Sequence, residues 1–159
     1  MKLLRGNREI PEPGTIAVDR ILLASEGRPI SAAAVELAAR LAKQGGGKVH
    51  VFTVARVWGS GLGLPNPGLL PSKGEWDVQR DVVRAAVEAL KGRGIDATGQ
   101  VLATRKATKK IMREAERLDC GVIVMSADPP RNRVLADLMW SQEPYRVQRK
   151  AEVPVYLAT

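Results

Sequence analysis

The chain has 159 residues and a formal net charge of +8, with 45% hydrophobic and 26% charged residues. This length allows one domain with a hydrophobic core, and the composition is typical of a globular protein in water. The single cysteine excludes an internal disulfide, and no apolar run has the length of a membrane span or the character of a signal peptide. We therefore expect a cytoplasmic protein that does not contact membranes.

Residues 1–19 contain two prolines and show no regular hydrophobic pattern. They predict a flexible leader before a single domain at residues 20–159. Residues 20–25 form a short apolar run, which is typical of a strand covered on both faces. A helix is expected at 32–43, and the three glycines at 45–47 would end it.

The alternation of strands and helices continues to the end of the chain. A second strand at 48–54 is followed by a long Gly- and Pro-rich connection at 55–74. Helical patterns then occur at 76–90, 106–118 and, in broken form, 133–150, and strand patterns at 95–103, 121–126 and 153–157. Strands that alternate with helices pair in parallel through right-handed crossovers. The order therefore predicts an α/β fold: a doubly wound, five-stranded parallel sheet with helices on both faces.

The strand at 121–126 leads directly into Ala127, Asp128, Pro129 and Pro130. In a doubly wound sheet, a ligand binds at the carboxyl ends of the strands, so this junction is a candidate site. A phosphate site needs backbone N–H groups there, usually supplied by glycines. Because proline has no N–H and aspartate is negatively charged, the junction is poorly suited to bind phosphate.

Three features of the chain occur together in one known family. The apolar run at 21–24 precedes an acid and a glycine, Glu26 and Gly27, and then an Ala-rich helix. A long loop follows the second strand and leads to a helix, an edge strand and another helix. The strand at 122–125 and the sequence at 149–155 complete the pattern. In this order and spacing, the chain after its leader resembles the universal stress proteins.

The resemblance implies a strand order of 3-2-1-4-5 and a homodimer formed through the last strand, Val153–Leu157. Some members of the family bind ATP and others do not. Binding members place the nucleotide beside the first two strands and hold its phosphates with a glycine-rich loop after the fourth strand. If a nucleotide binds here, the resemblance implies that its site contains Glu26, Gly27, Val54, Ala55, Ser126, Arg131 and Ser141.

The phosphate loop of this chain departs from the ATP-binding pattern. Ser126 and Pro129 occupy two of the early glycine positions, which removes an N–H donor and keeps a ligand away from the backbone. We therefore expect no ATP and no other cofactor. The expected function is regulatory, without catalysis, and depends on dimer and protein contacts. An adenine-nucleotide site with an atypical loop, in which Arg131 attracts the anion and Ser141 caps the last helix, is the alternative.

One predicted helix carries a basic face. Its residues are Lys106, Lys109, Lys110, Arg113 and Arg117. Such a face can bind an acidic protein or a nucleic acid, and the other interpretation is a solvated surface. The single histidine, His50, and the single cysteine, Cys120, do not form a recognisable metal or catalytic motif, and Cys120 is expected to pack in the core.

Overall fold

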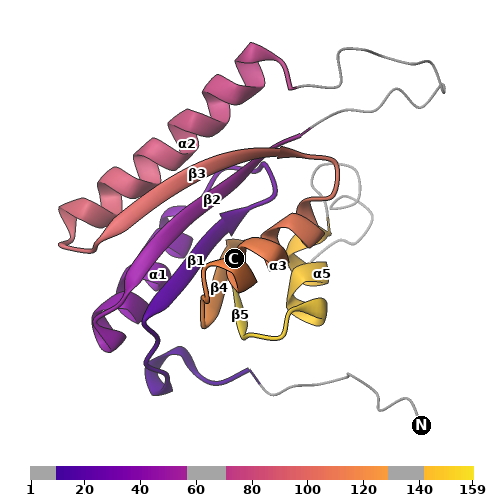
Figure 1. Ribbon diagram of the computed structural model, residues 1–159. Coiled ribbons are helices and arrows are strands. Elements are labelled where there is room, and N and C mark those ends of the chain that lie inside the picture. The colour runs from indigo at the N-terminus through magenta and orange to yellow at the C-terminus, as the bar shows by residue number, and fades with distance from the viewer. Residues whose placement is uncertain (1–9, 57–70, 129–141) are drawn as a thin grey trace, which may run out of the picture.

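The computed structural model describes residues 10–56, 71–128 and 142–159. They form a parallel sheet of five strands in the order β3-β2-β1-β4-β5, with helices on both faces (Figure 1). The strands are β1 (Arg20–Ser25), β2 (Lys48–Arg56), β3 (Ala97–Thr104), β4 (Val122–Ser126) and β5 (Val155–Ala158). The predicted fold class and strand order are confirmed.

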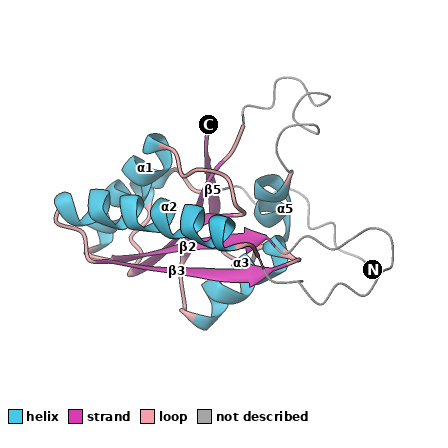
Figure 2. Cartoon of the chain, turned by 90° about the horizontal axis from the view of Figure 1, so that it is seen from above, coloured by secondary structure: helices cyan, strands magenta, loops and turns pink. Residues whose placement is uncertain are grey.

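The described helices are α1 (Ala32–Gly45), α2 (Lys73–Gly92), α3 (Ala107–Arg117) and α5 (Glu143–Lys150), with a short 3-10 helix, η1 (Pro13–Thr15). Figure 2 shows α2 and α3 on opposite sides of strands β2 and β3. Helix α2 begins three residues before the predicted start, because the Ser72 side chain accepts a hydrogen bond from the Glu75 N–H and caps it. The predicted helical residues 133–141 and most of the long connection, residues 57–70, lie outside the described residues.

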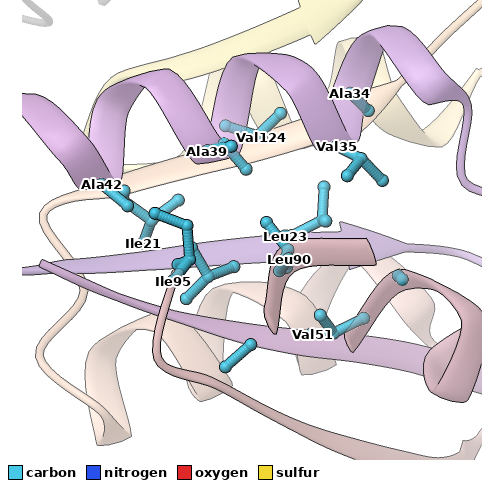
Figure 3. Close-up of a cluster of buried hydrophobic side chains, with 14 of the residues drawn as sticks. Ile21, Leu23, Ala34, Val35, Ala39, Ala42, Val51, Leu90, Ile95 and Val124 are labelled. Carbon is cyan, nitrogen blue, oxygen red and sulfur yellow. The ribbon is translucent and has the colours of Figure 1, made fainter. Parts of the chain in front are cut away.

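The two faces of the sheet are packed by alternate residues of the same strands. Ile21 and Leu23 of β1 contribute to the core beneath α1 and α2 (Figure 3). Leu22 and Ala24 contribute to the core beneath α3 and α5. Successive strand residues point to opposite faces, and both faces are covered here. This explains why the central strands are continuous apolar runs instead of alternating patterns.

Residues 10–19 are packed onto the domain, which differs from the flexible leader expected for residues 1–19. Ile16 and Val18 pack against the core on the α1 side of the sheet. The Tyr156 hydroxyl donates a hydrogen bond to the carbonyl oxygen of Pro11, at 2.6 Å. The sequence missed this attachment because it depends on contacts with β5 and α1 and not on a local pattern. Residues 1–9 lie outside the described part of the chain.

The end of α1 fits closely against this N-terminal segment. Gly46 has a φ of 63° and ends the helix in the left-handed conformation. A Cβ atom on Gly47 would lie 2.5 Å from the carbonyl oxygen of Val18 and 2.7 Å from that of Asp19. Only glycine allows the two backbones to approach this closely.

We expect Gly47→Ala to destabilise the protein by about 1–3 kcal/mol, the usual cost of overpacking a well-filled contact. The contacted atoms belong to the backbone and cannot move aside as a side chain would. Gly92→Ala is the matched control, because a Cβ atom there would have no neighbour within 4 Å. Urea denaturation of both variants measures the free energy of unfolding. Equal stability of the two variants would contradict the close packing of residues 18 and 19 on the end of α1.

Candidate functional site

The carboxyl ends of β1, β2 and β4 meet at one edge of the sheet. Strand β1 pairs with β2 on one side and with β4 on the other, so residues that follow these strands are neighbours. Glu26 and Arg28 follow β1, Arg56 ends β2, and Asp128 follows β4. This edge is where a doubly wound sheet binds its ligands.

A buried ion pair lies at the centre of this edge. Glu26 is 1% exposed and Arg28 is 6% exposed. The Nε of Arg28 donates a hydrogen bond to Oε1 of Glu26. The Nη1 of the same guanidinium lies 3.3 Å from Oδ2 of Asp128. Arg28 therefore joins the ends of β1 and β4 and is neutralised by two carboxylates of its own chain.

Burial raises the pKa of Glu26, and the charge of Arg28 opposes this effect. The second carboxyl oxygen, Oε2, is buried and has no hydrogen-bond partner in the described part of the chain. A buried acceptor without a partner is costly, so this oxygen is a place where a donor of a ligand could bind.

A second arginine extends the network to α5. The Nε of Arg56 donates to the backbone carbonyl oxygen of Glu26, at 3.0 Å. Its Nη2 donates to Oε2 of Glu143 in the first turn of α5, also at 3.0 Å. Arg56 therefore connects the ends of β1 and β2 with α5, and its charge is balanced by a carboxylate.

A cavity of about 440 Å³ lies between these strand ends and the start of α2. Its walls include Gly27, Val54, Ala55 and both arginines. Gln79 of α2 donates from Nε2 to the carbonyl oxygen of Gly27, at 3.0 Å, while its Oε1 is buried without a partner among the described residues. The cavity therefore combines apolar wall residues with one acceptor oxygen, of Gln79, that no described residue satisfies.

The structure brings together most of the predicted nucleotide-site residues. Glu26 lies at the same strand edge as Gly27, Val54 and Ala55, which line the cavity. Ser126 does not line it: its hydroxyl accepts the N–H of Ser31 at 2.9 Å and lies 3.1 Å from the Ser31 hydroxyl. Ser126 therefore connects β4 to the start of α1. Two further predicted residues, Arg131 and Ser141, lie outside the described residues, as does Pro129.

Three residues of the site, Arg28, Arg56 and Gln79, were not predicted from the sequence. Arg28 lies in a segment that reads as a plain turn, and Gln79 lies within a helical pattern. One signal was available for Arg28, because it follows an acid by two residues at the carboxyl end of a buried strand. Their partners come from separate elements, so only the folded arrangement shows their roles.

A sequence model of the universal stress protein family matches residues 17–158 of the chain. This chain belongs to the universal stress protein family. Its membership confirms the resemblance noted in the sequence and agrees with the observed strand order.

Solved universal stress proteins share this fold. One from Archaeoglobus fulgidus is 19% identical with a TM-score of 0.67, over 90% of this chain and 95% of that chain. A second structure from Archaeoglobus fulgidus, described in complex with dAMP, is 19% identical with a TM-score of 0.64, over 91% and 100%. UspA from Lactobacillus plantarum is 15% identical with a TM-score of 0.71, over 91% and 99%. These identities show the fold alone. No curated protein matches the sequence.

A second cluster of titratable groups lies between the sheet and α3 of this universal stress protein. The Nδ1 of His50 lies 2.8 Å from the Thr98 hydroxyl, and its Nε2 is buried with no partner in the ranges that the structure describes. Burial lowers the pKa of His50. Glu114 accepts two hydrogen bonds from Arg117, at 3.1 Å and 2.8 Å, and they hold the pKa of its carboxyl below the usual range.

The predicted basic face of α3 is only partly available. Arg117 is bound by Glu114, whereas Lys106, Lys109 and Arg113 are exposed and Lys110 is half-buried. Cys120 is buried, and burial raises the pKa of its thiol to about 11. The expectation that Cys120 packs in the core is confirmed.

Glu26→Gln should remove one component of the pH dependence of stability. Because the pKa of Glu26 is raised in the folded protein, the folded state binds this proton more tightly than the unfolded state. Its contribution is fully present below about pH 4.3, the pKa of an unstructured glutamate, and is lost as the pH rises through the folded pKa.

Urea denaturation of both proteins over this pH range measures the effect. The free energy of unfolding of the wild type should fall, relative to that of Glu26→Gln, as the pH rises from about 4.3 towards neutrality. A free energy of unfolding of the wild type that stays constant, or that rises with pH, relative to that of Glu26→Gln would contradict the raised pKa.

Proposed function

We propose that this universal stress protein is a cytoplasmic regulatory protein that acts through contacts with a second copy and with other proteins. In this proposal it does not hold ATP and is not an enzyme. The observation that carries the proposal is that Arg28 and Arg56 are both bound by carboxylates of the chain itself.

Binding a triphosphate here would require these ion pairs to be exchanged. Arg28 and Arg56 carry two positive charges, while Glu26, Asp128 and Glu143 supply three carboxyl groups around them. A phosphate that approached either arginine would therefore meet a carboxylate at about the same distance. Like charges close together in a partly buried site repel each other by about 1–4 kcal/mol. The described part of the site thus lacks the excess positive charge that a polyanion needs.

The adenosine half of a nucleotide fits the cavity better than its phosphates do. The cavity volume of about 440 Å³ is within the range of small-molecule sites. Among the described residues, Oε1 of Gln79 in the cavity wall has no hydrogen-bond partner, so it suits an amino or hydroxyl donor. One relative is described in complex with dAMP. Adenine-nucleotide binding through an atypical site is therefore our second candidate function.

The proposed self-contact uses the last strand. Among the described strands, β5 pairs only with β4, so its other edge offers backbone N–H and C=O groups to a second copy. Such an edge is suited to pairing between two identical strands. The proposed dimer therefore continues the sheet through β5, which spans Val155–Ala158 and begins two residues after the start of the predicted strand, Val153–Leu157. No helix in the described ranges has the length and apolar character needed to cross a membrane.

Isothermal titration calorimetry with ATP and Mg²⁺ tests the proposal. We expect no binding by the wild type at micromolar concentrations, because both arginines are occupied. The matched variant Asp128→Asn with Glu143→Gln removes two of the competing carboxylates while keeping the size of each side chain. This variant should bind ATP at least about tenfold more tightly than the wild type, as expected for a gain of one charge-assisted hydrogen bond.

Two outcomes would contradict the proposal. Micromolar binding of ATP to the wild type, lost in Arg56→Ala, would establish the second candidate function instead. Equal lack of binding by the wild type and by Asp128→Asn with Glu143→Gln would show that the carboxylates are not what excludes ATP.

A further inference from the structure

A second cavity of about 440 Å³ lies near the amino ends of the strands, opposite the site of Arg28 and Arg56 at their carboxyl ends. It is formed between α3 and the segment that connects α5 to β5. Helices α3 and α5 are in contact (Figure 1). Cys120, just before β4, is part of its wall, which places the cavity near the amino end of that strand. The expected nucleotide site lies at the carboxyl ends, so the two cavities are separate.

The inner surface of this cavity is apolar. Its apolar members are Met112, Ala115, Cys120, Ile123, Ala151 and Val153. Burial of the Cys120 thiol raises its pKa to about 11, so the thiol is neutral and adds no charge. An apolar surface of this kind gains stability when it is covered by an apolar part of a ligand.

Along α3, the positively charged residues around the opening come first and the negatively charged residues follow them. Lys109 and Arg113 are four residues apart and share one face of the helix, and Glu116 and Asp119 follow them towards its C-terminal end. Lys150, at the end of α5, and Glu152, two residues later, line the cavity from the other side. In the described residues, Lys109, Arg113 and Lys150 form no ion pair, unlike Arg117, which Glu114 holds.

We propose that this cavity binds a small free monocarboxylate with an apolar body, such as a medium-chain fatty acid. The carboxylate lies against Lys109 and Arg113, where the unneutralised positive charge is, and the apolar body covers Met112 and Ile123. Glu116 and Asp119 at the other end repel a second negative charge. The site therefore selects one anionic group and not two.

The same arrangement disfavours a nucleic acid on this surface. A phosphate backbone carries a regular series of negative charges, and Glu116 and Asp119 interrupt the positive charge that would follow it. None of the residues that line this cavity is aromatic, so bases have no stacking surface there. Of the two partners expected for the basic helix face, we therefore do not propose a nucleic acid. Binding of duplex DNA is instead one of the results that the experiments below would reveal.

Isothermal titration calorimetry with sodium decanoate tests the proposal, with decanol and decanedioate as matched ligands. Decanoate should bind, and each comparison ligand should bind about tenfold more weakly, since one lacks the charge and the other has a second charge. Lys109→Glu with Arg113→Glu should weaken decanoate binding by at least about tenfold. Arg40→Glu with Lys91→Glu makes the same change in net charge on α1 and α2, and should leave the affinity unchanged.

Two further measurements locate the ligand. Ala151→Phe fills the cavity from a half-buried position and should abolish binding while the protein stays folded by circular dichroism. In methyl NMR of the wild type, the Met112 signal should shift on titration with decanoate.

The proposal is overturned if decanoate does not bind, or if decanol or decanedioate binds as tightly. It is also overturned if both charge-reversal variants lose affinity equally, or if the Met112 signal does not shift. Binding to duplex DNA, to an acidic peptide or to phosphatidylglycerol vesicles without binding to decanoate would assign the surface to that partner. The titration with ATP is independent of these results, because it probes the other edge of the sheet.

Discussion

The buried ion pair between Glu26 and Arg28 is the interaction on which the rest of the site depends. Removing one partner of such a pair costs about 3–5 kcal/mol, because the other charge is left buried without compensation. Arg28 also contacts Asp128, and Arg56 binds both the Glu26 backbone and Glu143. Four elements of the fold are thereby connected at the carboxyl ends of the strands, where a doubly wound sheet binds its ligands.

In this network, the charged groups at the site bind one another and thereby connect parts of the fold. In a phosphate site, arginines and backbone N–H groups are directed towards the ligand and supply excess positive charge. Here the guanidinium groups of Arg28 and Arg56 are directed towards the carboxylates of their own chain. What remains is a cavity with apolar wall residues and the Gln79 acceptor oxygen, which has no partner among the described residues, and this suits uncharged donors better than phosphates.

The fold could be predicted from the sequence because its signals are local. Each buried strand is a short apolar run, and each is separated from the next by a helical pattern or a glycine-rich turn. The packing of residues 10–19 could not be predicted in this way. It depends on Val18 lying against Gly45 and Gly47, and on a hydrogen bond from Tyr156, which are contacts between distant parts of the chain.

The site could be predicted only in outline. Its position followed from the parallel sheet, and Glu26 was identified by its place after the first strand. Arg28 and Arg56 were missed because their partners lie on other elements, and an arginine in a turn has no distinctive pattern. Ser126 was predicted to be in the site only if a nucleotide binds, and its contact with Ser31, which is distant in sequence and adjacent in the fold, could not be predicted.

We propose that the chain's own carboxylates occupy Arg28 and Arg56, so that the protein holds no ATP. Native mass spectrometry of the protein, purified from cells without added nucleotide, tests this claim most directly. We predict that each species observed has the mass of the chain or of a whole number of chains, without a nucleotide. A species heavier by the mass of one adenine nucleotide per chain, lost in Arg56→Ala, would contradict it.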